Sequence, residues 1–414
     1  MSKSRTSAGW LVALAIVAVC GAAPAMAADS ATMNFYGFVM MDAGYNNEAI
    51  DPNWFDAQRP TKLPESQAAA DALGKDGSVF FSARQTRFGV KSTLPTEMGD
   101  IKTTFEFELY GVGVDAGQTT FRLRHAYGEL GKWGAGQTWS PFMDIDVFPN
   151  TLEYWGPNGM AFFRNVQLRY MPLQGDNSMT IALERPGASG DQGVSSEIAD
   201  LSGIRARYPL PDLSAEYRVT RPWGYFEAAG IVRQIEWDDI TAGPAQTQDL
   251  SDAVTGWGLN VSSNLKLGKA NVARLQFLHG EGVENYMNDA PVDIGTENTP
   301  SDPVQPVKGV ALPVTGIVAF LDHTWNEKFS SSIGYSRLDI DNSEGQSATA
   351  FKTGQYMLAN LLYTPVPNFM CGIEGGWIER ENKGDATTDG FKFDDTHIQV
   401  SFKYSFSINT GGNQ

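Results

Sequence analysis

The chain has 414 residues, of which 42% are hydrophobic and 19% charged, and its formal net charge is −17 at pH 7. This acidic balance argues against a nucleic-acid-binding protein, which gains its affinity from clustered Lys and Arg. The chain has two cysteines, and only Cys371 lies beyond the N-terminal segment described next, so no intramolecular disulfide is expected in the mature protein.

The first 27 residues have the features of a secretory signal peptide. Two basic residues come first, an apolar stretch follows over 10–19, and small residues at 25–27 form a cleavage site. Such a segment is removed from the mature protein. We therefore predict a signal peptide over residues 1–27 and a single mature domain over residues 28–414.

Two other routes to membrane attachment are disfavoured. A lipoprotein anchor at Cys20 is the alternative to signal cleavage, but Val19 just before it is bulkier than such sites usually accept. Beyond the signal peptide no run of 18 or more apolar residues occurs, which excludes a membrane-spanning helix.

The mature chain shows the alternation that is typical of β-strands. In residues 101–110, for example, Phe105 and Phe107 share one face while Glu106 and Glu108 share the other. The same criterion predicts sixteen strands, at residues 33–45, 79–94, 101–110, 119–129, 133–138, 165–170, 178–184, 213–220, 225–237, 255–267, 272–286, 314–325, 329–340, 351–363, 370–379 and 392–406.

The connections between these strands alternate strictly in length, with seven short turns and eight long loops. The only helical candidate, residues 65–73, lies inside the first long loop. Short turns at one end and long loops at the other are typical of membrane barrels. The sequence therefore predicts an all-β fold, a transmembrane antiparallel β-barrel of sixteen strands, with fourteen or eighteen as alternatives.

The strand at residues 119–129 indicates what each face of this barrel meets. Phe121 and Leu123 point one way, while Arg122 and Arg124 point the other, because side chains alternate across a strand. In a bilayer the apolar face lies in lipid and the arginines lie in a water-filled lumen.

Four segments resemble the DcaP-like family of outer-membrane porins. The strongest is GQTWSPFMDIDVFPNTLEYWGPNGMAFFRNVQLRY at 136–170, and the others are RQTRFGVKST at 84–93, TTFRLRHAYGELGKWGAGQTW at 119–139 and PLPDLSAEYR at 209–218. The resemblance implies a trimeric sixteen-stranded porin with a basic lumen that favours small carboxylates, including dicarboxylates. One departure is the C-terminus, which continues past Phe406 instead of ending on an aromatic residue.

We predict that the loop at 139–163 folds inward and narrows the pore. It is stiffened by prolines and combines acidic with aromatic side chains. An outer loop that covers the barrel mouth is the alternative. The candidate constriction residues on this loop are Asp144, Asp146, Glu153, Tyr154 and Trp155.

Basic residues on the neighbouring strands are the candidate solute ligands. A guanidinium is always charged and its planar fork matches a carboxylate. The alternative is that these groups only balance Glu106, Glu108 and the loop acids. The candidates are Arg84, Arg87, Lys91, Arg122, Arg124, Arg164 and Arg169.

These patterns and the family resemblance predict a porin for passive diffusion of small anionic solutes, namely mono- and dicarboxylates, across the bacterial outer membrane. The expected partners are those solutes, outer-membrane lipid and lipopolysaccharide, and two further copies in a homotrimer; no enzyme activity, cofactor or metal is implied. The histidines show no metal-ligand spacing. The alternatives are a secreted soluble β-rich carbohydrate-binding protein or glycoside hydrolase, with Glu106 and Glu108 as its carboxylates, and a plugged structural barrel.

Overall fold

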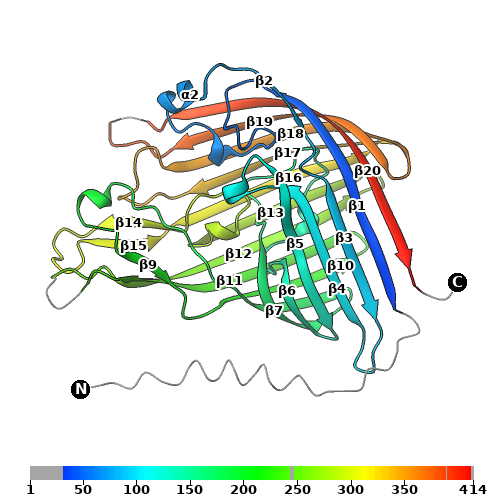
Figure 1. Cartoon of the computed structure of the whole chain (residues 1–414), viewed down its shortest axis with the longest axis horizontal. Helices are drawn as coiled ribbons and strands as arrows, with labels where there is room; N and C mark the ends of the chain where they lie inside the picture. The colour runs from blue at the N-terminus through cyan, green and yellow to red at the C-terminus, as the bar shows by residue number, and fades with distance from the viewer. Residues whose placement is uncertain (1–30, 243–246, 388, 412–414) are drawn as a thin grey trace.

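The polypeptide forms a closed antiparallel β-barrel of sixteen strands (Figure 1). The computed structural model describes residues 31–242, 247–387 and 389–411. The sheet closes where β1 pairs antiparallel with β20, from Met33 opposite Thr410 to Asn46 opposite His397. The predicted signal peptide, 1–27, lies outside the described residues.

The helical elements of the described chain are short and lie in loops. They are η1 (Pro60–Lys62), α2 (Gln67–Leu73), η2 (Gly113–Asp115), η3 (Ile145–Val147), η4 (Ser195–Glu197) and η5 (Glu284–Tyr286). The strands are β1 (Thr32–Asn46), β2 (Ser78–Ser82), β3 (Arg87–Leu94), β4 (Ile101–Tyr110), β5 (Thr119–Leu130), β6 (Trp133–Trp139), β7 (Arg164–Leu173), β8 (Asn177–Glu184), β9 (Ile204–Arg207), β10 (Asp212–Arg221), β11 (Gly224–Asp239), β12 (Asp252–Leu267), β13 (Asn271–Glu281), β14 (Ile294–Asn298), β15 (Val307–Ala311), β16 (Pro313–Thr324), β17 (Phe329–Ile340), β18 (Phe351–Val366), β19 (Phe369–Asn382) and β20 (Lys392–Thr410).

Two of the sixteen wall strands are interrupted. β2 and β3 pair with successive stretches of β1, and β9 and β10 pair with successive stretches of β11. The prediction of one continuous strand over 79–94 was therefore wrong at residues 83–86, where Thr86 N–H bonds to the Ala83 carbonyl in a turn. β14 and β15 form a separate hairpin in the long loop between the predicted strands 272–286 and 314–325.

The barrel wall has its apolar face outside and its polar face inside. Phe121, Leu259 and Ile333 leave 76%, 59% and 57% of their surface exposed, whereas Glu108 and Ser401 are fully buried. This distribution is the reverse of a soluble protein and matches a barrel whose outer face meets lipid. The predicted division of faces is confirmed.

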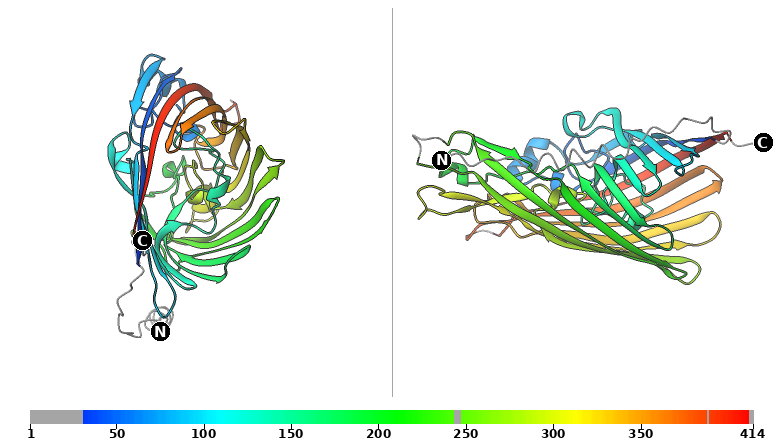
Figure 2. Two further views of the ribbon diagram at one scale, coloured as in Figure 1. Left: turned by 90° about the vertical axis from the view of Figure 1, so that its right-hand side faces the viewer. Right: turned by 90° about the horizontal axis from the view of Figure 1, so that it is seen from below.

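Long loops gather at one end of the barrel and short turns at the other (Figures 1 and 2). Aromatic pairs lie on strands near the short turns, with ring centroids 4.7 Å apart for Trp133 and Tyr170 and 5.0 Å apart for Phe369 and Tyr404. Such rings are favoured where a membrane meets water, so these pairs place the short-turn end near one membrane surface.

Three further predictions about element ends can be compared with the structure. The predicted helix at 65–73 is confirmed as α2, capped by the Ser66 hydroxyl, which accepts a hydrogen bond from the Ala69 N–H. The predicted strand 272–286 ends early, because β13 stops at Glu281 and the chain then turns inward. The last strand continues past Phe406, because residues 407–410 pair with β1.

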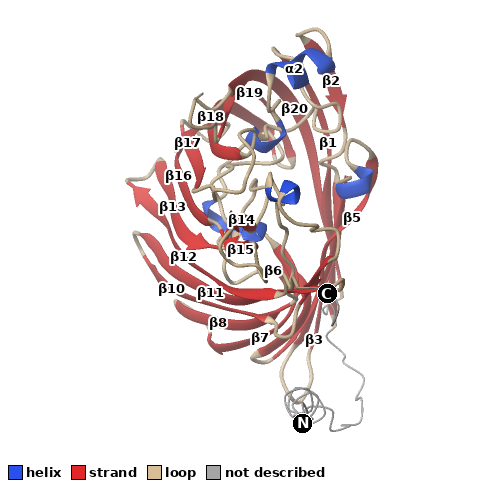
Figure 3. Ribbon diagram, turned by 90° about the vertical axis from the view of Figure 1, so that its left-hand side faces the viewer, coloured by secondary structure: helices blue, strands red, loops and turns tan. Residues whose placement is uncertain are grey.

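The lumen is occupied by loops rather than being an open tube, as the view along the barrel shows (Figure 3). Phe142 and Met143 of the 139–163 loop pack with Ile231, Leu278 and Leu338 of the wall, and all five side chains are buried. This apolar contact holds loop residues against the inner face of the barrel. None of the helices in the described ranges is long and apolar enough to cross a membrane.

Candidate constriction site

The loop at 139–163, which we call the constriction loop, crosses the lumen and bonds to the far wall. Asn150 donates from Nδ2 to Asp322 of β16 at 2.9 Å, and its carbonyl accepts from Asn360 of β18 at 2.6 Å. The Gly159 N–H donates to the Ser336 hydroxyl of β17 at 2.9 Å. The inward-folded loop predicted from the sequence is therefore confirmed.

Four arginines converge on two glutamates where this loop leaves the wall. Arg124 donates to Glu106 through Nε and to Glu108 through Nη1, both at 2.6 Å. The strand register brings these side chains together, because Arg87 on β3 lies opposite Glu108 on β4, and Glu108 lies opposite Arg122 on β5. Nitrogen atoms of the other three arginines reach Glu108 at 3.3 Å (Arg87), 3.5 Å (Arg122) and 3.8 Å (Arg164).

This arginine cluster, Arg87, Arg122, Arg124 and Arg164, has more positive charge than Glu106 and Glu108 neutralise. Its hydrogen-bonding capacity is also incompletely used. Arg164 Nη1 and Arg87 Nε are buried with no hydrogen-bond partner in the described part of the chain. Buried donors of this kind normally have a partner, so these two nitrogens have free capacity to bond a water molecule or a solute.

Two cavities meet at the arginine cluster. One, of about 540 Å³, extends towards the long loops, and the other, of about 390 Å³, extends towards Lys91 and Thr104, nearer the short turns. Arg87 and Arg124 line both cavities. Arg87 and Arg124 therefore lie where the two cavities adjoin, beside the constriction loop.

Two other predicted basic residues lie on β3 and β7. Lys91 lines the smaller cavity with its ammonium 5.0 Å from the Tyr36 ring centre. Arg169 donates to the Trp139 carbonyl and to Gln167, and it forms no ion pair with a carboxylate among the described residues. Lys91 therefore adds positive charge to the smaller cavity, whereas Arg169 lines neither cavity.

Arg84 is the predicted site residue that the structure places elsewhere. Its side chain is buried, forms an ion pair with Asp56 of the first long loop, and lies 4.1 Å from the Tyr110 ring centre. It lines neither of the two cavities. The turn at 83–86 directs the Arg84 side chain towards Asp56 in the first long loop. Arg84 is therefore not included in the proposed solute site.

The loop acids do not pair with the arginine cluster. Asp144 accepts from Arg218 at 2.7 Å, from the Tyr225 hydroxyl at 2.5 Å and from the Ser262 hydroxyl at 2.6 Å. Asp146 also pairs with Arg218. Arg218 of β10 therefore pairs with both loop acids and also with Glu227. Within the described residues the arginine cluster pairs only with Glu106 and Glu108.

Glu153 is almost fully buried, and its carboxyl group holds the backbone of the constriction loop. Its carboxylate accepts backbone N–H groups from Gln58, Trp155 and Gly156 at 2.6–3.0 Å. Burial raises the pKa of Glu153 to about 8, although those N–H groups act in the opposite direction. The three hydrogen bonds fix residues 153–156 of the constriction loop against Gln58 of the first long loop.

Tyr154 and Trp155 fix the same part of the constriction loop through contacts with different elements. The Tyr154 hydroxyl donates to Glu108, and its ring stacks on Tyr110 with centroids 3.7 Å apart. Trp155 donates from Nε1 to the Asn288 carbonyl at 2.9 Å and lies 3.8 Å from the Arg59 guanidinium. These contacts fix the two aromatic side chains in position beside the arginine cluster.

The sequence interpretation missed Arg218 and residues 282–293 as parts of the site. Arg218 lies on the polar face of a predicted strand, but nothing in the sequence indicates which loop it meets. Within the described residues no group of three His, Cys, Asp or Glu side chains is arranged to bind a metal ion.

Comparison with known proteins is consistent with this geometry. The chain is similar in structure to the outer membrane channel DcaP of Acinetobacter baumannii, at 21% identity, a TM-score of 0.74, and coverage of 93% of this chain and 100% of that one. It is also similar to an anion-selective porin from Comamonas acidovorans (10% identity, TM-score 0.57, 91% and 100% coverage) and to a trimer form of OmpT from Vibrio cholerae (14%, 0.54, 91% and 100%). No curated protein matches the chain.

The family comparison covers nearly the whole chain. The model of the DcaP outer membrane protein family matches residues 14–390. This match and the barrel with its inward-folded loop agree with the resemblance seen in the sequence. The chain belongs to the DcaP outer membrane protein family, and it is an outer-membrane channel.

Proposed function

We propose that this channel passes small anionic solutes, in particular mono- and dicarboxylates, down their concentration gradient. The observation that carries the proposal is the arginine cluster, in which four guanidinium groups face only two carboxylates. A local positive field in a narrow, low-dielectric passage acts on a solute more strongly than the net charge of the whole chain does.

Exposure indicates which members of the cluster meet the solute. The side chains of Arg87 and Arg122 are 25% and 28% exposed, whereas those of Arg124 and Arg164 are each 5% exposed. We infer that the first pair contacts the solute. Arg124 holds Glu106 and Glu108, and Arg164 lies 3.8 Å from Glu108. Lys403, on the wall of the larger cavity, supports the same preference.

The reversal potential of the purified channel in a planar bilayer tests this function. Under a KCl gradient the potential is expected to move towards the chloride equilibrium value, and succinate is expected to reduce the chloride current by competing for the arginines. A potential displaced towards the potassium equilibrium value would refute anion selectivity.

We also propose that the channel is a homotrimer. Five phenylalanines form a continuous cluster on the outer face of β3, β4, β5 and β20, with centroid separations of 4.9–6.3 Å along the cluster. The OmpT relative has a trimer form, and such an aromatic patch suits contact with a neighbouring copy. The cluster consists of Phe88, Phe105, Phe107, Phe121 and Phe406.

Replacing Phe107 and Phe121 together with Ala is expected to lower the temperature at which the trimer dissociates, because both rings would leave the contact. Chemical cross-linking followed by electrophoresis measures the trimer fraction. The matched control is Ile333→Ala with Leu259→Ala, which removes exposed side chains from other strands. Equal trimer stability in the two variants would contradict the proposed contact.

A further inference from the structure

Residues 282–293 leave the barrel wall and enter the lumen. β13 ends at Glu281, and Gly282 has a φ of 63°, a left-handed conformation that favours glycine. A Cβ on Gly282 would also lie 3.2 Å from the Ala311 Cβ. The chain then forms η5 and returns to the wall, where the Leu312 N–H bonds to the Asp293 carbonyl at 3.0 Å.

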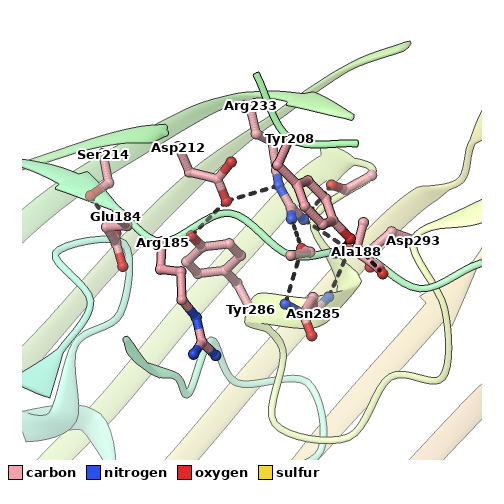
Figure 4. A network of polar contacts seen from close by, with 12 residues as sticks. Glu184, Arg185, Ala188, Tyr208, Asp212, Ser214, Arg233, Asn285, Tyr286 and Asp293 are labelled. Atoms are coloured by element: carbon pink, nitrogen blue, oxygen red, sulfur yellow. Dashed lines mark hydrogen bonds and ion pairs between the residues drawn. The ribbon is translucent and has the colours of Figure 1, made fainter. Parts of the chain in front are cut away.

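A buried arginine fixes the base of this segment (Figure 4). Arg233 of β11 donates from Nη1 to the Gly282 carbonyl and to Asp293, both at 2.9 Å, and its Nε lies 3.2 Å from Asp212. Asp293 also accepts the Asn285 N–H at 2.9 Å. Because Arg233 and Asp293 are both fully enclosed, both ends of the segment are held in one position.

The far side of the segment bonds to the constriction loop. Asn288 donates from Nδ2 to the carbonyls of Trp155 and Pro157, at 2.8 and 3.0 Å, and its N–H donates to the Met160 carbonyl at 2.8 Å. The Phe162 N–H donates to the Tyr286 carbonyl at 2.9 Å. The segment and the constriction loop therefore form one hydrogen-bonded unit.

The segment also bonds to the first long loop and borders the solute path. Asp289 accepts from Arg59 Nε at 2.8 Å and from the Thr61 hydroxyl at 2.6 Å. Asn285 and Ala290 are half-buried and line the 540 Å³ cavity, which Arg87, Arg122 and Arg124 also line. A solute that approaches the arginines from this cavity must pass these residues.

We propose that residues 282–293 are a second constriction element, which sets the size limit of the channel together with the constriction loop, and that Ala290 lines its narrow part. The inference rests on the channel function and not on the proposed preference for anions. Arg233 is a positioning residue, because it holds the segment without lining the cavity.

Ala290→Trp tests the proposal by filling space on the cavity side of the segment. In liposome swelling, entry of a disaccharide is expected to slow more than entry of a pentose, and the single-channel conductance is expected to fall. The matched control is Ser196→Trp, at an exposed position in η4, which is expected to change neither. A folded Ala290→Trp channel with unchanged conductance and swelling would overturn the proposal.

A second variant covers the case in which tryptophan prevents folding. Ala290→Cys, made in a Cys371→Ser background, is folded first and then treated in the bilayer with a methanethiosulfonate reagent. A stepwise fall in conductance is expected, because a residue on the solute path is reached from the aqueous pore. Absence of labelling, or labelling without a conductance change, would overturn the proposal. Anion preference is measured separately as a reversal potential, so failure of one proposal does not imply failure of the other.

Discussion

Replacing Arg87 and Arg122 together with Gln is expected to weaken the anion preference of the channel strongly. The variant leaves Arg124 and Arg164 against Glu106 and Glu108, so the positive excess of the arginine cluster disappears. A unit charge about 6 Å from the solute contributes roughly 3 kcal/mol at an effective dielectric constant of about 20. Loss of two such charges should weaken block by succinate more than tenfold, because about 1.4 kcal/mol corresponds to a factor of ten.

The reversal potential under a KCl gradient measures this change, and heat-modifiable electrophoresis checks that the barrel is folded. Arg124 remains bonded to both glutamates in the variant, so the wall is expected to be intact. The matched control is Arg207→Gln with Arg337→Gln, because these two side chains are 50% and 42% exposed and pair with acids on the outer face. A double Arg87/Arg122 variant that remains as anion-selective as the wild type would exclude both residues from the solute path.

Arg218→Leu is expected to detach one side of the constriction loop and to raise the conductance. Arg218 pairs with Asp144, Asp146 and Glu227. Without it, Asp144 and Glu227 remain almost fully buried with no cation, and breaking a buried ion pair in this way costs about 3–5 kcal/mol. The loop can relieve that cost by moving Asp144 into water, which widens the passage.

Single-channel recording distinguishes this outcome from general unfolding, because a detached loop gives a larger and noisier open state. Arg218→Lys keeps the charge but loses the planar fork that reaches several carboxylates, so an intermediate conductance is expected. Arg221→Leu is the control on the same strand, since Arg221 bonds only to Asn177 and a neighbouring carbonyl. Wild-type conductance in the Arg218→Leu channel would show that the loop does not depend on this anchor.

Part of the arginine cluster follows from local sequence. Short turns connect β3 to β4 and bring neighbouring strands side by side, and inward-facing positions then lie opposite one another. Arg87, Glu108 and Arg122 meet through this register alone. Arg164 joins them only because the constriction loop returns to the wall at that point, which is a tertiary event.

The predictions that failed concern places where the backbone leaves the regular ladder. The residue pattern at 79–94 continues through 83–86, yet a turn there directs Arg84 to Asp56. The pattern at 272–286 also continues, yet Gly282 turns the chain into the lumen. The alternation of apolar and polar residues shows which side of a strand faces lipid. It does not show where the backbone gives up hydrogen bonds to the neighbouring strand in favour of hydrogen bonds to a distant loop.

The sequence by itself determined the barrel and its lipid-facing side, because a bilayer imposes a two-residue period on every strand. It favoured sixteen strands over fourteen or eighteen, and an inward-folded loop over one that covers the barrel mouth. Only the tertiary structure decided which charges cancel. Asp144 pairs with Arg218 of β10 and not with the arginine cluster, so the cluster has more positive charge than its two glutamates cancel. Such pairings depend on how the loops fold inside the closed barrel. The spacing of residues along the chain does not encode which wall residue a loop residue will meet.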